Sequence, residues 1–233
     1  LARQSRHLEY SRRTSTSDLG TISSISAMLV SHTCFQWKTK TTEILPKLFE
    51  IELNNQITTD GCHISRNPSN QLKILRNLIW IKHSLLNTKH IIPPILDVTI
   101  NRMGSILKSY RYGDGLLALF HGGYEENRSI ITETLATIPK NFLLTTPTSF
   151  SSYERLSAGP SIVLVDVGAP SIGAQGENSH ASTLAFEFSI GRERLIVNCG
   201  HRDSGSWKDA SRSTAAHSTC TLGNLNSSEI LPN

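Results

Sequence analysis

The stretch LAFEFSIGRERLIVNC, residues 184–199, carries the clearest structural signal in the chain. Two runs of apolar and β-branched residues, Leu184–Ile190 and Arg194–Cys199, flank the turn formers Gly191-Arg192, which predicts an antiparallel hairpin. In the first run, large apolar residues alternate strictly with Ala185, Glu187 and Ser189. This alternation predicts one dry face and one wetter face on the strand.

The pattern of short strands extends from this hairpin over the second half of the chain. Glycine, proline, asparagine and serine clusters separate the runs, and Ala158-Gly159-Pro160 predicts a second hairpin turn. The six candidate strands are Leu116–Phe120, Tyr153–Ser157, Ser161–Val167, Leu184–Ile190, Arg194–Cys199 and Thr214–Leu222. We therefore expect antiparallel sheets after Gly113.

Upstream, to about Tyr110, apolar residues recur every three or four positions, which is the spacing of helices that pack on one side. Pro93-Pro94 fixes the start of the last helix. The four predicted helical stretches are Ile22–Phe35, Ile44–Leu53, Gln71–Leu86 and Ile95–Leu107. The fold class expected is α+β, with helical hairpins followed by sheets.

Composition and charge exclude few functions. The 233 residues hold 23 Lys and Arg against 19 Asp and Glu, a formal charge of +4, and the basic residues are scattered. Nucleic-acid readers concentrate basic charge on one face, so we expect no nucleic-acid partner, while the charge suits an anionic polysaccharide. No run approaches the ~18 apolar residues of a membrane span, and the start is not a signal peptide. Both ends look cut from a longer protein.

The four cysteines, Cys34, Cys62, Cys199 and Cys220, have no metal-type spacing. Cys199 and Cys220 fall on predicted neighbouring strands and would be able to form a disulfide in an oxidising compartment. Buried thiols are the favoured interpretation.

Four stretches, in order, resemble the heparinase II/III family of polysaccharide lyases. They are residues 56–68 (QITTDGCHISRNP), 112–123 (YGDGLLALFHGG), 180–200, which begins HASTLAFEF and ends LIVNCG, and 212–219 (RSTAAHST). The resemblance implies that residues 1–110 form part of an α/α-toroid. It also implies that residues 111–233 form a β-sandwich that is incomplete at the C-terminus.

Family members cleave uronic-acid chains by β-elimination, which needs a neutralised carboxylate, a base and an acid. The resemblance assigns these roles to an Asn-His pair, a Tyr and a His. The Tyr position falls at Asn70 and the His position at Asn178, and no Asn-His pair stands near Ser17-Asp18, where His7 is out of register. The catalytic residues are therefore unknown.

The resemblance also implies a metal set, which by position is His180, Asn198 and His217. Two histidines and a carboxylate suit Zn²⁺, and Asn weakens the set because it brings no charge. The alternative is that both histidines are hydrogen-bonded residues at sheet ends.

Three further residues have competing interpretations. His63 and Arg66 are the candidate substrate-binding residues, because both can donate to a glycan carboxylate. The alternative is that they belong to a solvated loop face. Asp166, at the end of a β-branched run, is expected to be a turn former or strand cap, and the alternative is a catalytic acid.

The leading functional hypothesis, by resemblance, is a lyase acting on uronic-acid-containing glycans in the periplasm or envelope of a bacterium. The alternative is a catalytically impaired relative that binds glycan or serves in envelope assembly. A serine hydrolase is disfavoured because the chain has no G-x-S-x-G elbow.

Overall fold

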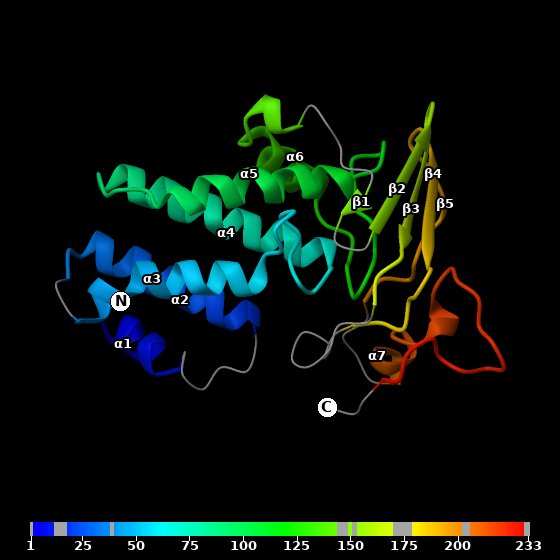
Figure 1. Cartoon of the computed structure of the whole chain (residues 1–233), viewed down its shortest axis with the longest axis horizontal. Coiled ribbons are helices and arrows are strands. Elements are labelled where there is room, and N and C mark those ends of the chain that lie inside the picture. The colour runs from blue at the N-terminus through cyan, green and yellow to red at the C-terminus, as the bar shows by residue number, and fades with distance from the viewer. Residues whose placement is uncertain are drawn as a thin grey trace.

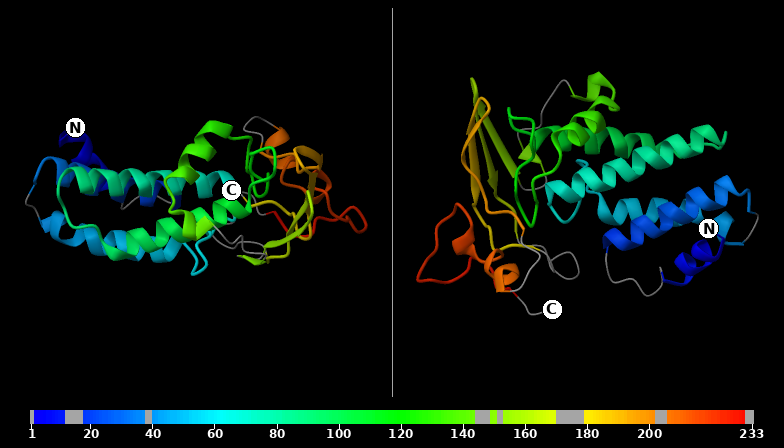
Figure 2. Two further views of the ribbon diagram at one scale, coloured as in Figure 1. Left: turned by 90° about the horizontal axis from the view of Figure 1, so that it is seen from above. Right: turned by 180° about the vertical axis from the view of Figure 1, so that it is seen from behind.

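The computed structural model describes residues 2–11, 18–37, 40–143, 149–150, 153–169, 179–201 and 206–230. The chain forms a layer of helices first and an antiparallel sheet after it. The helices pack end-on against one side of the sheet (Figure 1). Two further views show the same two-part arrangement (Figure 2). The α+β class is therefore confirmed.

The helical layer comprises α1 (Ala2–Ser11), α2 (Asp18–Cys34), α3 (Lys40–Gln56), α4 (Pro68–Asn87) and α5 (Pro94–Ser109). All four predicted helical stretches are confirmed, and α1 was not predicted. Helix α2 packs against α3 and α4, and α4 packs against α5, so the helices are paired. Whether they are part of a toroid stays a prediction.

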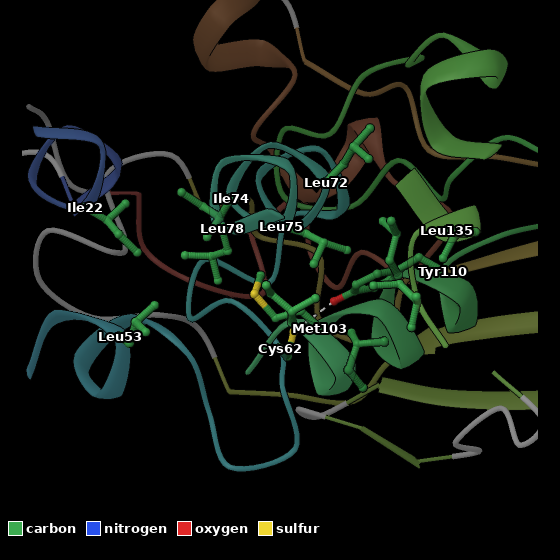
Figure 3. Close-up of a cluster of buried hydrophobic side chains, with 14 of the residues drawn as sticks. Ile22, Leu53, Cys62, Leu72, Ile74, Leu75, Leu78, Met103, Tyr110 and Leu135 are labelled. Carbon is green, nitrogen blue, oxygen red and sulfur yellow. Dashed lines mark hydrogen bonds between the residues drawn. The ribbon is translucent and has the colours of Figure 1, made fainter. Parts of the chain in front are cut away.

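The core lies mainly between these helices and continues towards the sheet. Figure 3 shows Leu75 and Leu78 of α4 with Met103 of α5 and Tyr110 just after it, all fully buried. In the same cluster the thiol of Cys62 lies 3.1 Å from the hydroxyl of Tyr110. All four cysteines carry thiols and not disulfides, but only Cys62 is buried.

The sheet has the order β1 (Ser149–Phe150), β2 (Tyr153–Ala158), β3 (Ser161–Asp166), β4 (Phe186–Ile190) and β5 (Glu193–Ile196). Every neighbouring pair is antiparallel. Both predicted hairpins are confirmed, since Ala158 pairs with Ser161 and Ile190 pairs with Glu193. The described residues form one sheet of the expected sandwich.

Two predicted strands are wrong. Residues 116–120 form a loop, because the amide of Leu119 donates to the carboxylate of Glu187 and that of Ala118 donates back to Tyr110. Residues 214–222 begin with the 3-10 turn η3 (Thr214–Ala216), where the Thr214 hydroxyl donates to the carbonyl of Ala181. At Leu119 and Thr214, hydrogen bonds to distant residues take the place of a strand ladder, and residues 111 and 117 form only an isolated bridge.

On β4 the buried face is the polar one. Glu187 and Ser189 are fully buried, whereas Phe186 and Phe188 are half-buried and Ile190 is 41% exposed. The polar residues therefore face inward, towards the loop at residues 112–119, and the large apolar residues face outward. Alternation correctly predicted two unlike faces but not which of them is covered.

Short elements complete the chain: α6 (Arg128–Ala136), η1 (Lys140–Leu143) and α7 (Ser206–Ala210). Helix α6 lies in the region expected to be only sheet, and it begins at Asn127, whose side chain accepts from the amide of Ser129 at 2.9 Å. No helix among the described residues has the length and apolar character to cross a bilayer.

Candidate functional site

A buried polar cluster lies where the loop before α4 meets the sheet. Asn67 caps α4: its side-chain oxygen accepts from the amides of Ser69 and Asn70 at 2.8 and 3.2 Å. Its side-chain nitrogen donates to the carbonyl of His121 at 2.8 Å. One short amide thus fixes both the helix start and the loop that precedes α6.

Arg66, directly before the cap, crosses from the helical layer to the sheet. Its backbone is left-handed, with a φ of 56°, and its guanidinium forms a buried ion pair with Asp166 at the end of β3. The same group donates to the carbonyl of Ala169 at 2.8 Å and lies 5.1 Å from the centre of the Tyr153 ring. The Tyr153 hydroxyl donates to the carbonyl of Arg66 at 2.9 Å.

His121 extends this ion pair towards the other histidines. Its Nε2 lies 2.9 Å from the second oxygen of Asp166, and its Nδ1 accepts from the backbone amide of His180 at 3.4 Å. Burial, followed by the nearby charge of Arg66, lowers the pKa of His121 well below its usual value. The ring is therefore neutral, and its Nε2 lies beside Asp166 without a hydrogen bond to it.

The two histidines predicted from sequence are brought together. Nδ1 of His180 lies 3.1 Å from Nε2 of His217, and Nδ1 of His217 lies 3.0 Å from Oδ1 of Asn198. The Asn198 side-chain nitrogen donates to Glu187 at 3.2 Å. All four side chains are buried. His180, Asn198 and His217 lie on loops before β4, after β5 and after η3, and Glu187 lies on β4.

Burial sets the protonation of the cluster. It lowers the pKa of His180 to about 3, with His217 adding to the effect, and lowers the pKa of His217 to about 4. Burial likewise raises the pKa of Glu187 above its usual value, and that of Tyr153 far above its ordinary range. Both histidines are therefore neutral at pH 7, and Tyr153 is no proton donor of ordinary strength.

The predicted substrate-binding residues do not form a solvated loop face. His63 is 1% exposed and its ring contacts Ser65 at 2.8 Å and Gln56 at 3.3 Å, while burial lowers its pKa to about 4. Arg66 is committed to Asp166. Contact of His63 and Arg66 with a substrate stays a prediction. In the structure both side chains contact other residues of the protein.

The structure describes one of the two positions, Asn70 and Asn178, at which the catalytic residues implied by the resemblance are replaced. The side-chain nitrogen of Asn70, in the first turn of α4, donates to the hydroxyl of Ser65 at 3.1 Å. Asn178 lies outside the described residues.

The residues implied for zinc do not fit that metal. The Asn198 oxygen contacts one ring nitrogen of His217 and His180 contacts the other, so the three side chains do not converge on one point. Among the described residues no group of three or more His, Cys, Asp or Glu side chains is arranged to hold a metal ion. Zinc sites use three or four protein ligands.

Sequence analysis missed Asp166, His121 and Glu187 as members of this cluster. Glu187 stands out in the sequence as the one charged residue in an apolar strand, which in hindsight signals a buried carboxylate with fixed partners. Its carboxylate accepts from the backbone amides of Leu119 and Asn198 at 2.9 and 3.1 Å. The other two residues carry no comparable local signal.

The comparisons with known proteins agree with this architecture. Residues 149–233 match the family model described as heparinase II/III-like, C-terminal. The chain is similar to the crystal structure of heparinase III, with a TM-score of 0.71 and 12% identity over 91% of this chain and 40% of that one. It is similar to heparan sulfate lyase HepC from Pedobacter heparinus, with a TM-score of 0.68 and 14% identity over 89% of this chain and 37% of that one.

A sequence relative has a different description. The chain is 29% identical over 171 residues to FtsZ-localized protein C of Caulobacter vibrioides (strain NA1000 / CB15N). The match covers 73% of this chain and 30% of that protein. The chain thus spans well under half the length of the proteins it matches.

Proposed function

Because residues 149–233 are a heparinase II/III-like C-terminal domain within a heparinase III-like fold, we propose that the protein is a lyase relative that binds an acidic polysaccharide without cleaving it. Binding of a uronic-acid-containing glycan is inferred from the family and is consistent with the formal charge of +4. An envelope or extracellular location belongs to the same proposal.

The position of Asn70 carries the non-cleaving part of the proposal. Where the resemblance assigns a tyrosine as proton donor, the chain has an amide that donates to Ser65. An amide neither gives nor takes a proton in the pH range where proteins work. The buried histidines nearby have pKa values near 3 or 4, and Tyr153 has a strongly raised pKa, so none replaces the missing acid.

The test is to incubate the full-length protein with heparin, heparan sulfate and alginate, and to measure binding and ultraviolet absorbance in parallel. Elimination creates an unsaturated uronate that absorbs in the ultraviolet. Binding to at least one acidic glycan, weaker binding to uncharged dextran and no absorbance are expected. Absorbance that rises with time would establish a lyase and overturn the non-cleaving proposal, and no binding to any glycan would overturn glycan recognition.

A second candidate function is favoured by the relative from Caulobacter, whose identity to this chain exceeds that of the lyase structures. In this case the protein localises with FtsZ, as the name of that relative says of it. A fluorescent fusion of the full-length protein is expected to form a band at the division site. Uniform distribution in dividing cells would remove this candidate.

A further inference from the structure

The resemblance to the heparinase II/III family implies zinc at His180, Asn198 and His217. The hydrogen bonds among these residues instead join them in a line. The two nitrogens of an imidazole ring point in diverging directions. Since Asn198 contacts Nδ1 of His217 at 3.0 Å and His180 contacts Nε2 at 3.1 Å, the two neighbours lie on opposite sides of the ring. The side chains form a line that ends at Glu187 and not a triangle around an ion.

The direction of each hydrogen bond in this line follows from the asparagine. Its side-chain nitrogen donates to Glu187 at 3.2 Å, so its oxygen is the atom that faces His217. An amide oxygen only accepts, and therefore Nδ1 of His217 carries the proton and Nε2 carries the lone pair. It follows that Nδ1 of His180 carries a proton and donates to that lone pair.

In this arrangement, nitrogen atoms that would bind zinc already take part in hydrogen bonds. Zinc binds unprotonated nitrogens and usually at least three protein ligands. The lone pair of His217 is already used by His180, and Asn198 brings no charge. The remaining ring nitrogen, Nε2 of His180, is buried and has no hydrogen-bond partner among the described residues.

We propose that Glu187, Asn198, His217 and His180 form a metal-free relay of directed hydrogen bonds, in which Nδ1 of His180 donates to Nε2 of His217. The relay ties β4 to the loops that follow β5 and η3. It also explains the asparagine: an aspartate here would place a second carboxylate about 3.2 Å from Glu187, where the amide now donates.

Two measurements on the wild-type protein test the relay without any variant. After incubation with zinc and dialysis, elemental analysis is expected to find no retained zinc, and added zinc is expected to leave the melting temperature unchanged. Nitrogen NMR of the imidazoles is expected to find a proton on Nδ1 of both His180 and His217. One zinc ion retained per chain, or a proton on Nε2 of His217, would overturn the proposal.

A matched pair of variants tests the role of the amide. Asn198→Asp is expected to lower the melting temperature at pH 7, with no recovery on adding zinc, because it sets two buried carboxylates side by side. Asn141→Asp makes the same change at an exposed position in η1 and is expected to have little effect. Equal melting temperatures for the two variants, or zinc-dependent recovery of Asn198→Asp, would contradict the relay.

Discussion

Arg66 and Asp166 show how single residues join the two parts of the molecule. Their side chains are 9% and 1% exposed, and they come from the loop before α4 and the end of β3. Taking two charges out of water is costly, and only mutual pairing with further hydrogen bonds offsets that cost. Asp166 gains such bonds from the Ser182 hydroxyl at 3.0 Å and the Gly168 amide at 3.1 Å.

Removing one partner of this pair should therefore destabilise the protein strongly. Arg66→Met keeps an apolar stem of similar length but leaves the Asp166 carboxylate buried without its cation. We expect the free energy of unfolding to fall by about 3–5 kcal/mol. Urea denaturation followed by circular dichroism measures this change.

The matched control is Lys82→Met, which removes one partner of an ion pair with Asp97 whose side chains are 35% and 46% exposed. Solvent-exposed pairs contribute about 0–1 kcal/mol, so this variant should unfold almost as the wild type does. If Arg66→Met and Lys82→Met have equal urea midpoints, the buried pair does not hold the layers together.

The polar cluster was only partly predictable from sequence. His180 and His217 were expected to meet because the resemblance links two motifs that are far apart in the chain. Asp166 was expected to be a turn former or strand cap, and at the end of β3 it does accept from the amide of Gly168. Its ion pair with Arg66 was not predictable, because Arg66 lies 100 residues away and no local pattern indicates the pair. Local sequence shows which residue types are available, whereas burial and long-range partners determine their roles.

Strand β4 illustrates the same limit for a whole element. Its alternation predicted two faces correctly, because side chains on a strand point to opposite sides with a period of two. The choice between them depended on the loop at residues 112–119, which supplies an amide to the Glu187 carboxylate. The four helices and two hairpins were predictable because their signals are local, namely apolar spacing and turn formers.

The outward face of the sheet exposes apolar side chains that soluble domains normally cover. Leu156 on β2 is 60% exposed and Leu195 on β5 is 56% exposed, and the helices lie on the other side of the sheet (Figure 2). Exposed apolar surface binds hydrophobic dyes. We expect the double variant Leu156→Lys, Leu195→Lys to lower the fluorescence of bound ANS, with little change in melting temperature.

A control for this prediction is Ile91→Lys, at a residue between α4 and α5 that is 92% exposed. Substitution of one scattered apolar residue should leave ANS fluorescence unchanged. If Ile91→Lys lowers the fluorescence as much as the double variant does, the dye does not report on the sheet face.

The buried histidines make the stability of the whole molecule depend on pH. Burial lowers the pKa of His63 to about 4, of His180 to about 3 and of His217 to about 4, against 6.5 for an unburied histidine. Between these values the unfolded chain binds protons that the folded protein excludes. The part of the free energy of unfolding that depends on neutral histidines is therefore fully present above pH 6.5. It is lost as the pH falls towards 4.

Each of these histidines contributes a slope of up to about 1.4 kcal/mol per pH unit in that window, because a shift of one pKa unit corresponds to that free energy. We expect urea midpoints to be equal at pH 8 and pH 7 and to fall steeply from pH 6 to pH 5. His63→Gln removes one titrating group from the core and should reduce the slope, whatever its effect on stability at pH 8. A midpoint that is constant from pH 7 to pH 5, or a slope that His63→Gln leaves unchanged, would show that these rings do not resist protonation as their burial requires.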